Sequence, residues 1–286
     1  MRRRDLLRPE LMAVRPVPVS AWPTIANIPQ GAVVLDSDGV VKQKVGDYLV
    51  PAPVTIIGSG PLASAPAASA ANQNLFYMST DFGLCKYVSV FNNAGEDYVN
   101  CGRPAHLISL MAPSNPYKID AIYSISQDVT GYVFGLSGGP GMFQAGLFYD
   151  ADMNQMRSAV GATPAAATPS TTTTLNTFYC ATIENRASAA TLSVCGKSGE
   201  IPNGTTTTTA NLYIGGRTDG ISSNLEGLIA KLVFRTEAGA VIDTLDFNKW
   251  DGTGKVRFDS GYACTVTDGT PLTAKSYSLI PMSVLQ

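Results

Sequence analysis

Apolar and polar residues alternate with a period of two along much of this 286-residue chain, and this pattern restricts its fold more than any other feature. The clearest segments are residues 118–125, 132–136 and 228–235, where β-branched and aromatic side chains recur at every second position. Successive side chains of a strand point to opposite faces, so these segments predict half-buried strands. No stretch shows a capped helical period. Short strands separated by turn residues predict an all-β protein built as an antiparallel β-sandwich or barrel.

The register of one hairpin can be predicted from the sequence. Residues 178–183 and 191–195 flank a turn built on residues 185–188. Folding about that turn puts apolar residues on one face and polar residues with two cysteines on the other. The predicted facing pairs are Ile183 with Leu192, Ala181 with Val194, Thr182 with Ser193, and Cys180 with Cys195. We interpret the two cysteines as neighbouring reduced thiols, because a disulfide would require an oxidising setting.

The overall composition excludes several classes of function. Charged residues make up 15% of the chain, the net charge is -2 and the pI is about 5.4, which argues against nucleic acid as a partner. No apolar run is long enough to predict a membrane span. The basic start of the chain resembles an export signal, but Arg8, Pro9 and Glu10 interrupt its apolar part. We therefore interpret residues 1–30 as a retained arm.

The cysteine and histidine content also argues against a disulfide framework, histidine-dependent catalysis and most metal sites. The chain has five cysteines, an odd number, and they are widely spaced, which favours reduced thiols over a disulfide framework. His106 is the single histidine, so Ser-His, Cys-His and multi-histidine metal sites are disfavoured. We predict no cofactor and no metal.

Changes in composition predict four parts of the chain. Residues 1–30 form an extended N-terminal arm, and residues 31–71 contain a small β element followed by an Ala/Ser/Pro-rich linker at 58–71. Residues 72–245 carry the run of strands, and residues 246–286 form a C-terminal β extension that either closes the edge of the sandwich or serves as an assembly arm.

The arm combines arginines, prolines and apolar residues. Its prolines prevent helix propagation and favour extended chain. A solvated tail has no reason to carry many apolar side chains, so we expect the arm to bury them on another surface, of this chain or of a neighbour. The predicted assembly residues are Arg2, Arg3, Arg4, Leu6, Leu7, Leu11 and Trp22.

Two acidic patterns of the sequence are candidate sites. Asp243 and Asp246 are three residues apart on a predicted strand, so they point to opposite faces, and we interpret them as a solvated strand end. With no other cluster of carboxylates, the sequence predicts no catalytic residue. Residues 150–154 resemble the start of a calcium loop, but the required glycine and glutamate are missing, so a hairpin turn fits better.

A glycine-rich loop spans residues 135–143 and is the most distinctive loop of the chain. One interpretation is a rim that presents aromatic rings to a glycan, with Tyr132, Phe143 and Tyr149 as the candidate binding residues. The alternative is a plain connection in which Phe143 packs back onto its own strands.

Residues 212–217 and 225–235 carry a recognisable pattern. A strand ends in Ile-Gly-Gly, with Gly215 and Gly216 allowing a sharp turn, and Gly227 permits a close approach before a long strand. This pattern resembles the closing signature of laminin-G-like domains of the concanavalin A-like family. The resemblance covers residues 72–245, although Cys195-Gly196 stands where the family has Asp-Gly and the family's tryptophan near the start of that hairpin is absent. It implies a jelly roll of two antiparallel sheets. By analogy with some laminin-G relatives, it also implies a calcium ion at the rim, held by Asp128 or Asp219, as an alternative to the absence of a metal.

An apolar arm, low charge and abundant Thr, Ser, Ala and Gly together resemble structural proteins of bacteriophage particles, such as fibres, appendages and decoration proteins. On this basis we expect a non-enzymatic virion protein, anchored through its arm, whose partners are other virion proteins, copies of itself and a host-surface glycan. A carbohydrate-binding adhesin or receptor-binding module is the alternative. A polysaccharide-degrading enzyme is the third hypothesis.

Overall fold

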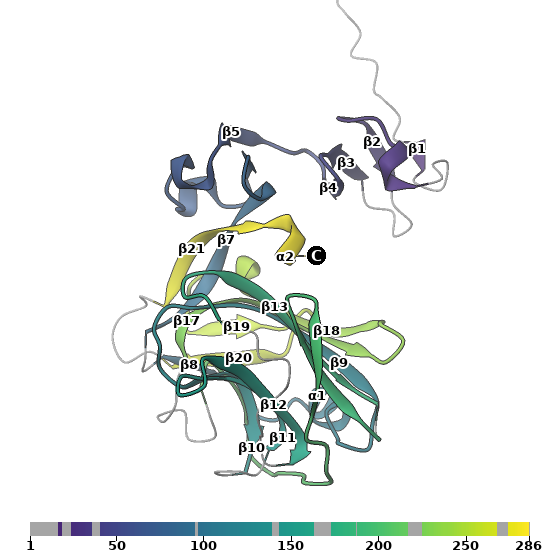
Figure 1. Cartoon of the computed structure of the whole chain (residues 1–286), viewed down its shortest axis with the longest axis vertical. Helices are drawn as coiled ribbons and strands as arrows, with labels where there is room; N and C mark the ends of the chain where they lie inside the picture. The colour runs from purple at the N-terminus through teal and green to yellow at the C-terminus, as the bar shows by residue number, and fades with distance from the viewer. Residues whose placement is uncertain are drawn as a thin grey trace, which may run out of the picture. The chain divides into compact units, whose positions relative to one another are not determined.

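The computed structural model describes residues 17–18, 24–35, 41–94, 97–138, 143–162, 173–186, 188–216, 225–267 and 274–285 (Figure 1). The chain divides into two compact units. The N-terminal unit contains residues 1–66 and 75–86, and the sandwich unit contains residues 67–74 and 87–286. The predicted assembly residues Arg2, Arg3, Arg4, Leu6, Leu7, Leu11 and Trp22 lie outside the described residues.

The N-terminal unit is built from short strands. Its described part contains a sheet in the order β1-β2-β3-β4, in which β1 is parallel to β2 and the other pairs are antiparallel. A second group consists of β5, β6 and the start of β7. The bounds are β1 (Val17–Pro18), β2 (Val33–Leu35), β3 (Val41–Val45), β4 (Tyr48–Pro51), β5 (Ile56–Gly60), β6 (Phe76–Ser79) and β7 (Gly83–Ala94).

Regular secondary structure extends into the segment whose composition predicts a linker. Residues 58–71 contain the end of β5, the 3-10 helix η3 (Leu62–Ser64) and the start of η4 (Ala70–Asn72). A further 3-10 helix, η2 (Ile25–Asn27), precedes β2.

The sandwich unit consists of two sheets. The first has the order β15-β14-β13-β9-β17-β7, with β18 paired to β17 and β21 paired to β7. Its strands are β9 (Tyr117–Ile125), β13 (Phe178–Asn185), β14 (Ala190–Val194), β15 (Lys197–Ile201), β17 (Glu226–Thr236), β18 (Val241–Asp246) and β21 (Lys275–Pro281). Four of these strands were predicted from the sequence: β9 at residues 118–125, β17 at 228–235, and β13 and β14 as the hairpin at 178–195.

The second sheet has the order β12-β11-β10-β16-β8-β20-β19 and is antiparallel throughout its described pairs. Its strands are β8 (Tyr98–Asn100), β10 (Gly131–Ser137), β11 (Phe143–Asp150), β12 (Gln155–Ala162), β16 (Leu212–Ile214), β19 (Lys255–Arg257) and β20 (Ala263–Thr267). The chain crosses repeatedly between the two sheets, as in a jelly roll. The antiparallel β-sandwich predicted from the sequence is confirmed.

Helices are short in the described part of the chain. Besides η2, η3 and η4, they are α1 (Ala105–Leu110), the 3-10 helix η5 (Phe247–Lys249) and α2 (Met282–Leu285). None of the helices in the described residues has the length and apolar character needed to cross a membrane.

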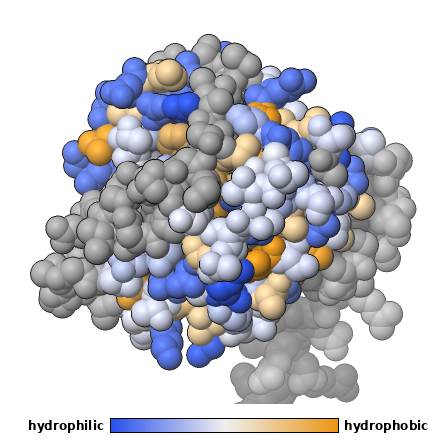
Figure 2. All heavy atoms as spheres, turned by 90° about the horizontal axis from the view of Figure 1, so that it is seen from below, coloured by the Kyte–Doolittle hydropathy of each residue, from blue (hydrophilic) through white to orange (hydrophobic). Residues whose placement is uncertain are grey.

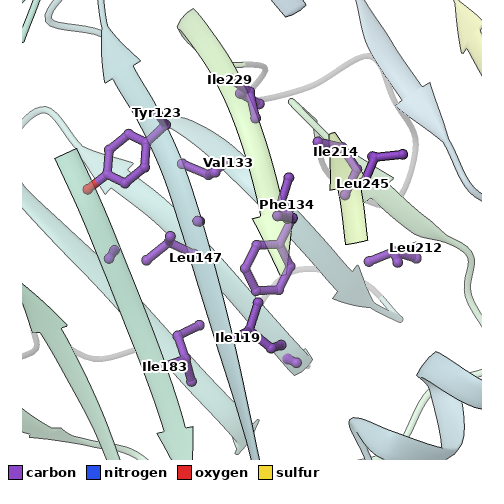
Figure 3. Packing of buried hydrophobic residues seen from close by; sticks show 14 of the residues in the cluster. Ile119, Tyr123, Val133, Phe134, Leu147, Ile183, Leu212, Ile214, Ile229 and Leu245 are labelled. Carbon is purple, nitrogen blue, oxygen red and sulfur yellow. The ribbon is translucent and has the colours of Figure 1, made fainter. Parts of the chain in front are cut away.

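The core lies between the two sheets and draws on every second residue of the strands. Ile119 and Tyr123 of β9 and Ile183 of β13 face Val133 and Leu147 from the opposite sheet (Figure 3). Isolated bridges join the sheets at two places, Val160 with Asn203 and Leu245 with Phe258. Burial of these apolar side chains is the main source of stability for such a sandwich.

The hairpin register predicted from the sequence is confirmed for three of the four pairs. In β13 and β14, Ala181 faces Val194, Thr182 faces Ser193, and Ile183 faces Leu192. The apolar members are buried, as the alternation requires. Backbone pairing ends at Ala181 and Val194, just before the two cysteines.

The glycines of the predicted signature occupy constrained positions. Gly215 has φ +78°, in the left-handed region that favours glycine, and its carbonyl accepts a hydrogen bond from the Asn93 amide. Gly216 follows it and is also buried. Gly227 lies where β17 passes so close to β9 that a Cβ atom would stand 2.1 Å from the carbonyl oxygen of Ser124.

The C-terminal residues contribute to both sheets. Strands β19 and β20 form the edge of the second sheet. Of the two alternatives for residues 246–286, this part of the chain follows the one in which the extension closes the edge of the sandwich. Strand β21 and helix α2 lie on the outer face of the first sheet, where Ile280 packs with Val88, Val90 and Ile122. The drawing shows β21 in yellow beside β7 (Figure 1).

Candidate functional site

The predicted aromatic glycan rim is wrong, because its side chains are buried. Phe143 is 1% exposed and Tyr132 7%, and Tyr149 is fully buried. Tyr132 stacks on Phe143 and Phe148, with ring centroids 5.5 and 4.9 Å apart. The rings pack back on their own sheet because Gly135 faces Gly146 across β10 and β11, which leaves room for Phe143. The alternative, in which Phe143 packs onto its own strands, is confirmed.

Tyr149 and Asp128 form a hydrogen bond at one rim of the sandwich unit. The Tyr149 hydroxyl donates to Asp128 Oδ1 at 2.5 Å, and Asn154 Oδ1 lies 3.0 Å away. Burial, helped by the Asp128 carboxylate, raises the pKa of Tyr149 well above its ordinary value. Asp219, the other candidate calcium ligand, lies outside the described residues. In the part of the chain that the structure describes, no group of three or more His, Cys, Asp or Glu side chains could hold a metal ion.

The hairpin turn predicted at residues 150–154 is confirmed. Asp150 faces Gln155 where β11 pairs with β12. The Asp150 carboxylate pairs with Arg157 at 2.5 Å, and the Arg157 guanidinium lies over the ring of Phe148. These contacts hold the acidic turn within the sheet.

Asp243 is not the solvated strand end that the sequence predicted. Its side chain is 1% exposed and accepts hydrogen bonds from three parts of the fold. His106 Nε2 of α1 lies 2.7 Å from Oδ2, and Ser260 Oγ donates to the same oxygen at 2.6 Å. The backbone amides of Thr244 and Ser260 donate to Oδ1 at 2.9 and 3.0 Å. A carboxylate only accepts hydrogen bonds, so His106 carries its proton on Nε2.

This arrangement contains Ser, His and Asp but not the geometry of a catalytic triad. In a triad the histidine stands between the serine and the aspartate, whereas here Asp243 stands between Ser260 and His106. Burial alone would raise the pKa of Asp243, but the hydrogen bonds from Ser260, His106 and Thr244 outweigh burial and lower it. The cluster therefore holds α1, β18 and the β19–β20 turn together.

A pocket of about 660 Å³ opens beside β19. It is lined by residues 249–251 and 253–259, which form the turn after η5 and the edge strand itself. The sequence produces this turn locally: Asp246 caps η5 by accepting from the Asn248 amide, and Gly252 adopts φ +87°. Trp250 anchors the wall, since its ring packs on Phe91 and Phe247.

Charged groups of both signs line the pocket. Lys249 Nζ pairs with Asp259 Oδ1 at 2.6 Å, and Asp251 accepts from the Thr253 amide at 2.9 Å. Lys255 and Arg257 are exposed and alternate with the buried Val256 along β19. The Trp250 Nε1 proton is donated to the Thr253 carbonyl at 2.9 Å, which fixes the turn.

This pocket was not predicted from the sequence. The signal was a tryptophan followed by an Asp-Gly turn and by alternating basic residues at 255 and 257. Such a pattern also occurs at ordinary protected edge strands, so it does not by itself indicate a site.

On the face drawn in Figure 2, apolar residues lie singly or in small groups among hydrophilic ones.

No family model and no curated protein matches the sequence. Among solved structures, the chain is similar to mouse laminin alpha1 chain domains LG4-5, with 11% identity and a TM-score of 0.39 over 77% of this chain and 52% of that one. It is also similar to Trypanosoma rangeli sialidase in complex with the inhibitor DANA, with 18% identity and a TM-score of 0.36 over 53% of this chain. The chain spans 27% of that sialidase. Similarity at this level carries no functional inference.

Proposed function

We propose that the chain is a non-enzymatic, lectin-like structural or attachment protein that binds carbohydrate in the pocket beside β19. The observation that carries the proposal is the lining of this pocket, which contains lysine, arginine, aspartate and threonine beside the buried Trp250. Sugar hydroxyls both donate and accept hydrogen bonds, so they fit a lining of lysine, arginine, aspartate and threonine. Small-ligand pockets of about 300–1,000 Å³ are typical, and this one lies within that range.

The pocket carboxylates support binding rather than hydrolysis. A glycosidase needs a general acid whose pKa is raised. In the pocket, hydrogen bonding from the Thr253 backbone lowers the pKa of Asp251. Asp259 is paired with Lys249. Asp251 therefore does not have the raised pKa that a general acid requires.

Replacing both Lys255 and Arg257 by alanine is expected to reduce glycan affinity by about tenfold or more without changing the melting temperature, because both side chains are exposed. A glycan array with the wild-type protein identifies the ligand, and titration of that ligand against the variant measures the loss. Lys197→Ala, at an exposed lysine that begins β15, is the matched control and should keep wild-type affinity. No bound glycan on the array, or equal losses in both variants, would contradict the proposal.

We also propose a place in a virion for this protein. The low charge and the apolar, proline-rich residues 1–30 support it, since a chain whose surface is shared with neighbours needs little charge. Other virion proteins and further copies of the chain would be its partners. The host-surface glycan would be the ligand of the pocket.

Removing residues 1–30 is expected to abolish self-association and incorporation into particles while the sandwich unit still folds. Light scattering measures self-association, copurification with particles measures incorporation, and far-UV circular dichroism measures whether the sandwich unit folds. Since residues 87–286 contain both sheets of the sandwich unit, their signal should persist. A full-length chain that stays monomeric and outside particles, like its truncated form, would rule out the virion proposal without touching the glycan proposal.

A further inference from the structure

Two pairs of cysteines lie close together in the sandwich unit. In the second sheet Asn100 faces Thr265, and Cys101 and Cys264 come directly after this pair; both are 1% exposed. In the first sheet the strand pairing ends at Ala181 and Val194, and Cys180 and Cys195 come directly after this last pair and line the same cavity. All of these cysteines are free thiols.

The second pair differs from the first because it is open to solvent. Cys195 is exposed and Cys180 half-buried, and both line a cavity of about 430 Å³ with Ser283 and Val284 of α2. Cys195 has φ +52° and Gly196 φ +75°, which makes a two-residue turn between β14 and β15. This turn holds the Cys195 side chain at the end of the hairpin, beside the strand that carries Cys180.

We propose that Cys180 and Cys195 are a modification site at which a low-molecular-weight disulfide, such as oxidised glutathione, forms an intramolecular disulfide. The Cys195 thiolate attacks one sulfur of the oxidant, and one glutathione thiolate leaves. The Cys180 thiolate then attacks the Cys195 sulfur of this mixed disulfide, and the second glutathione thiolate leaves. Two protons are released from the protein thiols, the protein is oxidised by two electrons, and the oxidant is reduced to two glutathiones.

The surroundings of the two sulfurs set the order of these steps. Burial raises the pKa of Cys180 to about 11. Burial also raises the pKa of Cys195, but the nearby Lys197 opposes it. The exposed Cys195 is therefore the first to react, and Cys180 is the resolving thiol. The inference goes beyond the proposed glycan binding, since the cavity of α2 and the pocket of β19 share no lining residue.

The test uses the native, full-length, reduced protein. It is incubated with oxidised glutathione, the remaining thiols are alkylated under denaturing conditions, and intact mass and peptide mapping locate the products. The expected result is one disulfide joining Cys180 to Cys195, with the buried Cys101 and Cys264 alkylated as thiols. The disulfide should also raise the melting temperature by a few degrees, and reduction with dithiothreitol should reverse the rise.

Two variants complete the test. Cys180→Ser should stop the reaction at a glutathione adduct on Cys195, and Cys195→Ser should give neither the adduct nor the disulfide. A wild-type protein that accumulates only the Cys195 adduct, or that joins Cys101 to Cys264 first, would overturn the proposal. The wild-type mapping decides the matter even if a variant fails to fold.

Discussion

Replacing Gly227 by alanine is expected to unfold the sandwich unit, or to cost at least about 3 kcal/mol of its free energy of unfolding. A Cβ at this position would lie 2.1 Å from the Ser124 carbonyl oxygen, 3.2 Å from its carbon and 3.3 Å from Ile125 Cα. All three atoms are backbone, so no side chain can rotate away. Relief requires β17 and β9 to separate where Gly227 faces Ile125, at the centre of the first sheet.

Urea unfolding followed by tryptophan fluorescence measures this effect. Gly254→Ala is the matched control, because a Cβ on Gly254 meets nothing within 4 Å and its φ lies outside the left-handed region. The control should change the free energy of unfolding by less than about 1 kcal/mol. If Gly227→Ala were as stable as the control, the close approach of β17 and β9 would be wrong, and with it the register of the sheet.

The hairpin at residues 178–195 shows what the sequence predicts well. Its register follows from the alternation of apolar and polar residues in two strands joined by one short turn. All the residues that set the register therefore lie close together in the sequence. The glycines at 215 and 227 stand out in the sequence as a pattern, but the neighbours that require glycine there, Asn93 and Ser124, lie far away in the sequence. The pattern therefore marks the two positions without identifying the strands that approach them.

The errors concern contacts that are far apart in the sequence. Asp243 and His106 are 137 residues apart, and no local pattern indicates that α1 covers the end of β18. Phe143 is an exception, because its partners are near in the sequence: the glycine-rich segment suggests an exposed loop, but β10 and β11 pair so that Gly146 faces Gly135 and leaves space for the ring. The pocket beside β19 depends on Trp250 packing onto Phe91, from a distant part of the chain.

Asp243→Ala is expected to lower the free energy of unfolding by about 3 kcal/mol, because it leaves the donors of His106, Ser260 and Thr244 without their acceptor. The carboxylate is 1% exposed, whereas the His106 side chain is 38% exposed and can regain water. Asp259→Ala is the matched control. It breaks the Lys249 ion pair, whose side chains are 60% and 46% exposed, and such surface pairs contribute at most about 1 kcal/mol.

The same carboxylate makes the stability of the sandwich depend on pH. Its folded pKa is lower than that of an unfolded aspartate, about 3.9. Asp243 therefore contributes its full stabilisation above about pH 4, and this contribution is lost as the pH falls through the lower, folded pKa. Asp243→Asn keeps the shape but cannot ionise, so its free energy of unfolding should decline less than that of the wild type between about pH 5 and pH 2. If the free energies of unfolding of the two proteins declined equally over this pH range, Asp243 would already be neutral in the fold. Its four hydrogen bonds would then not hold a charge.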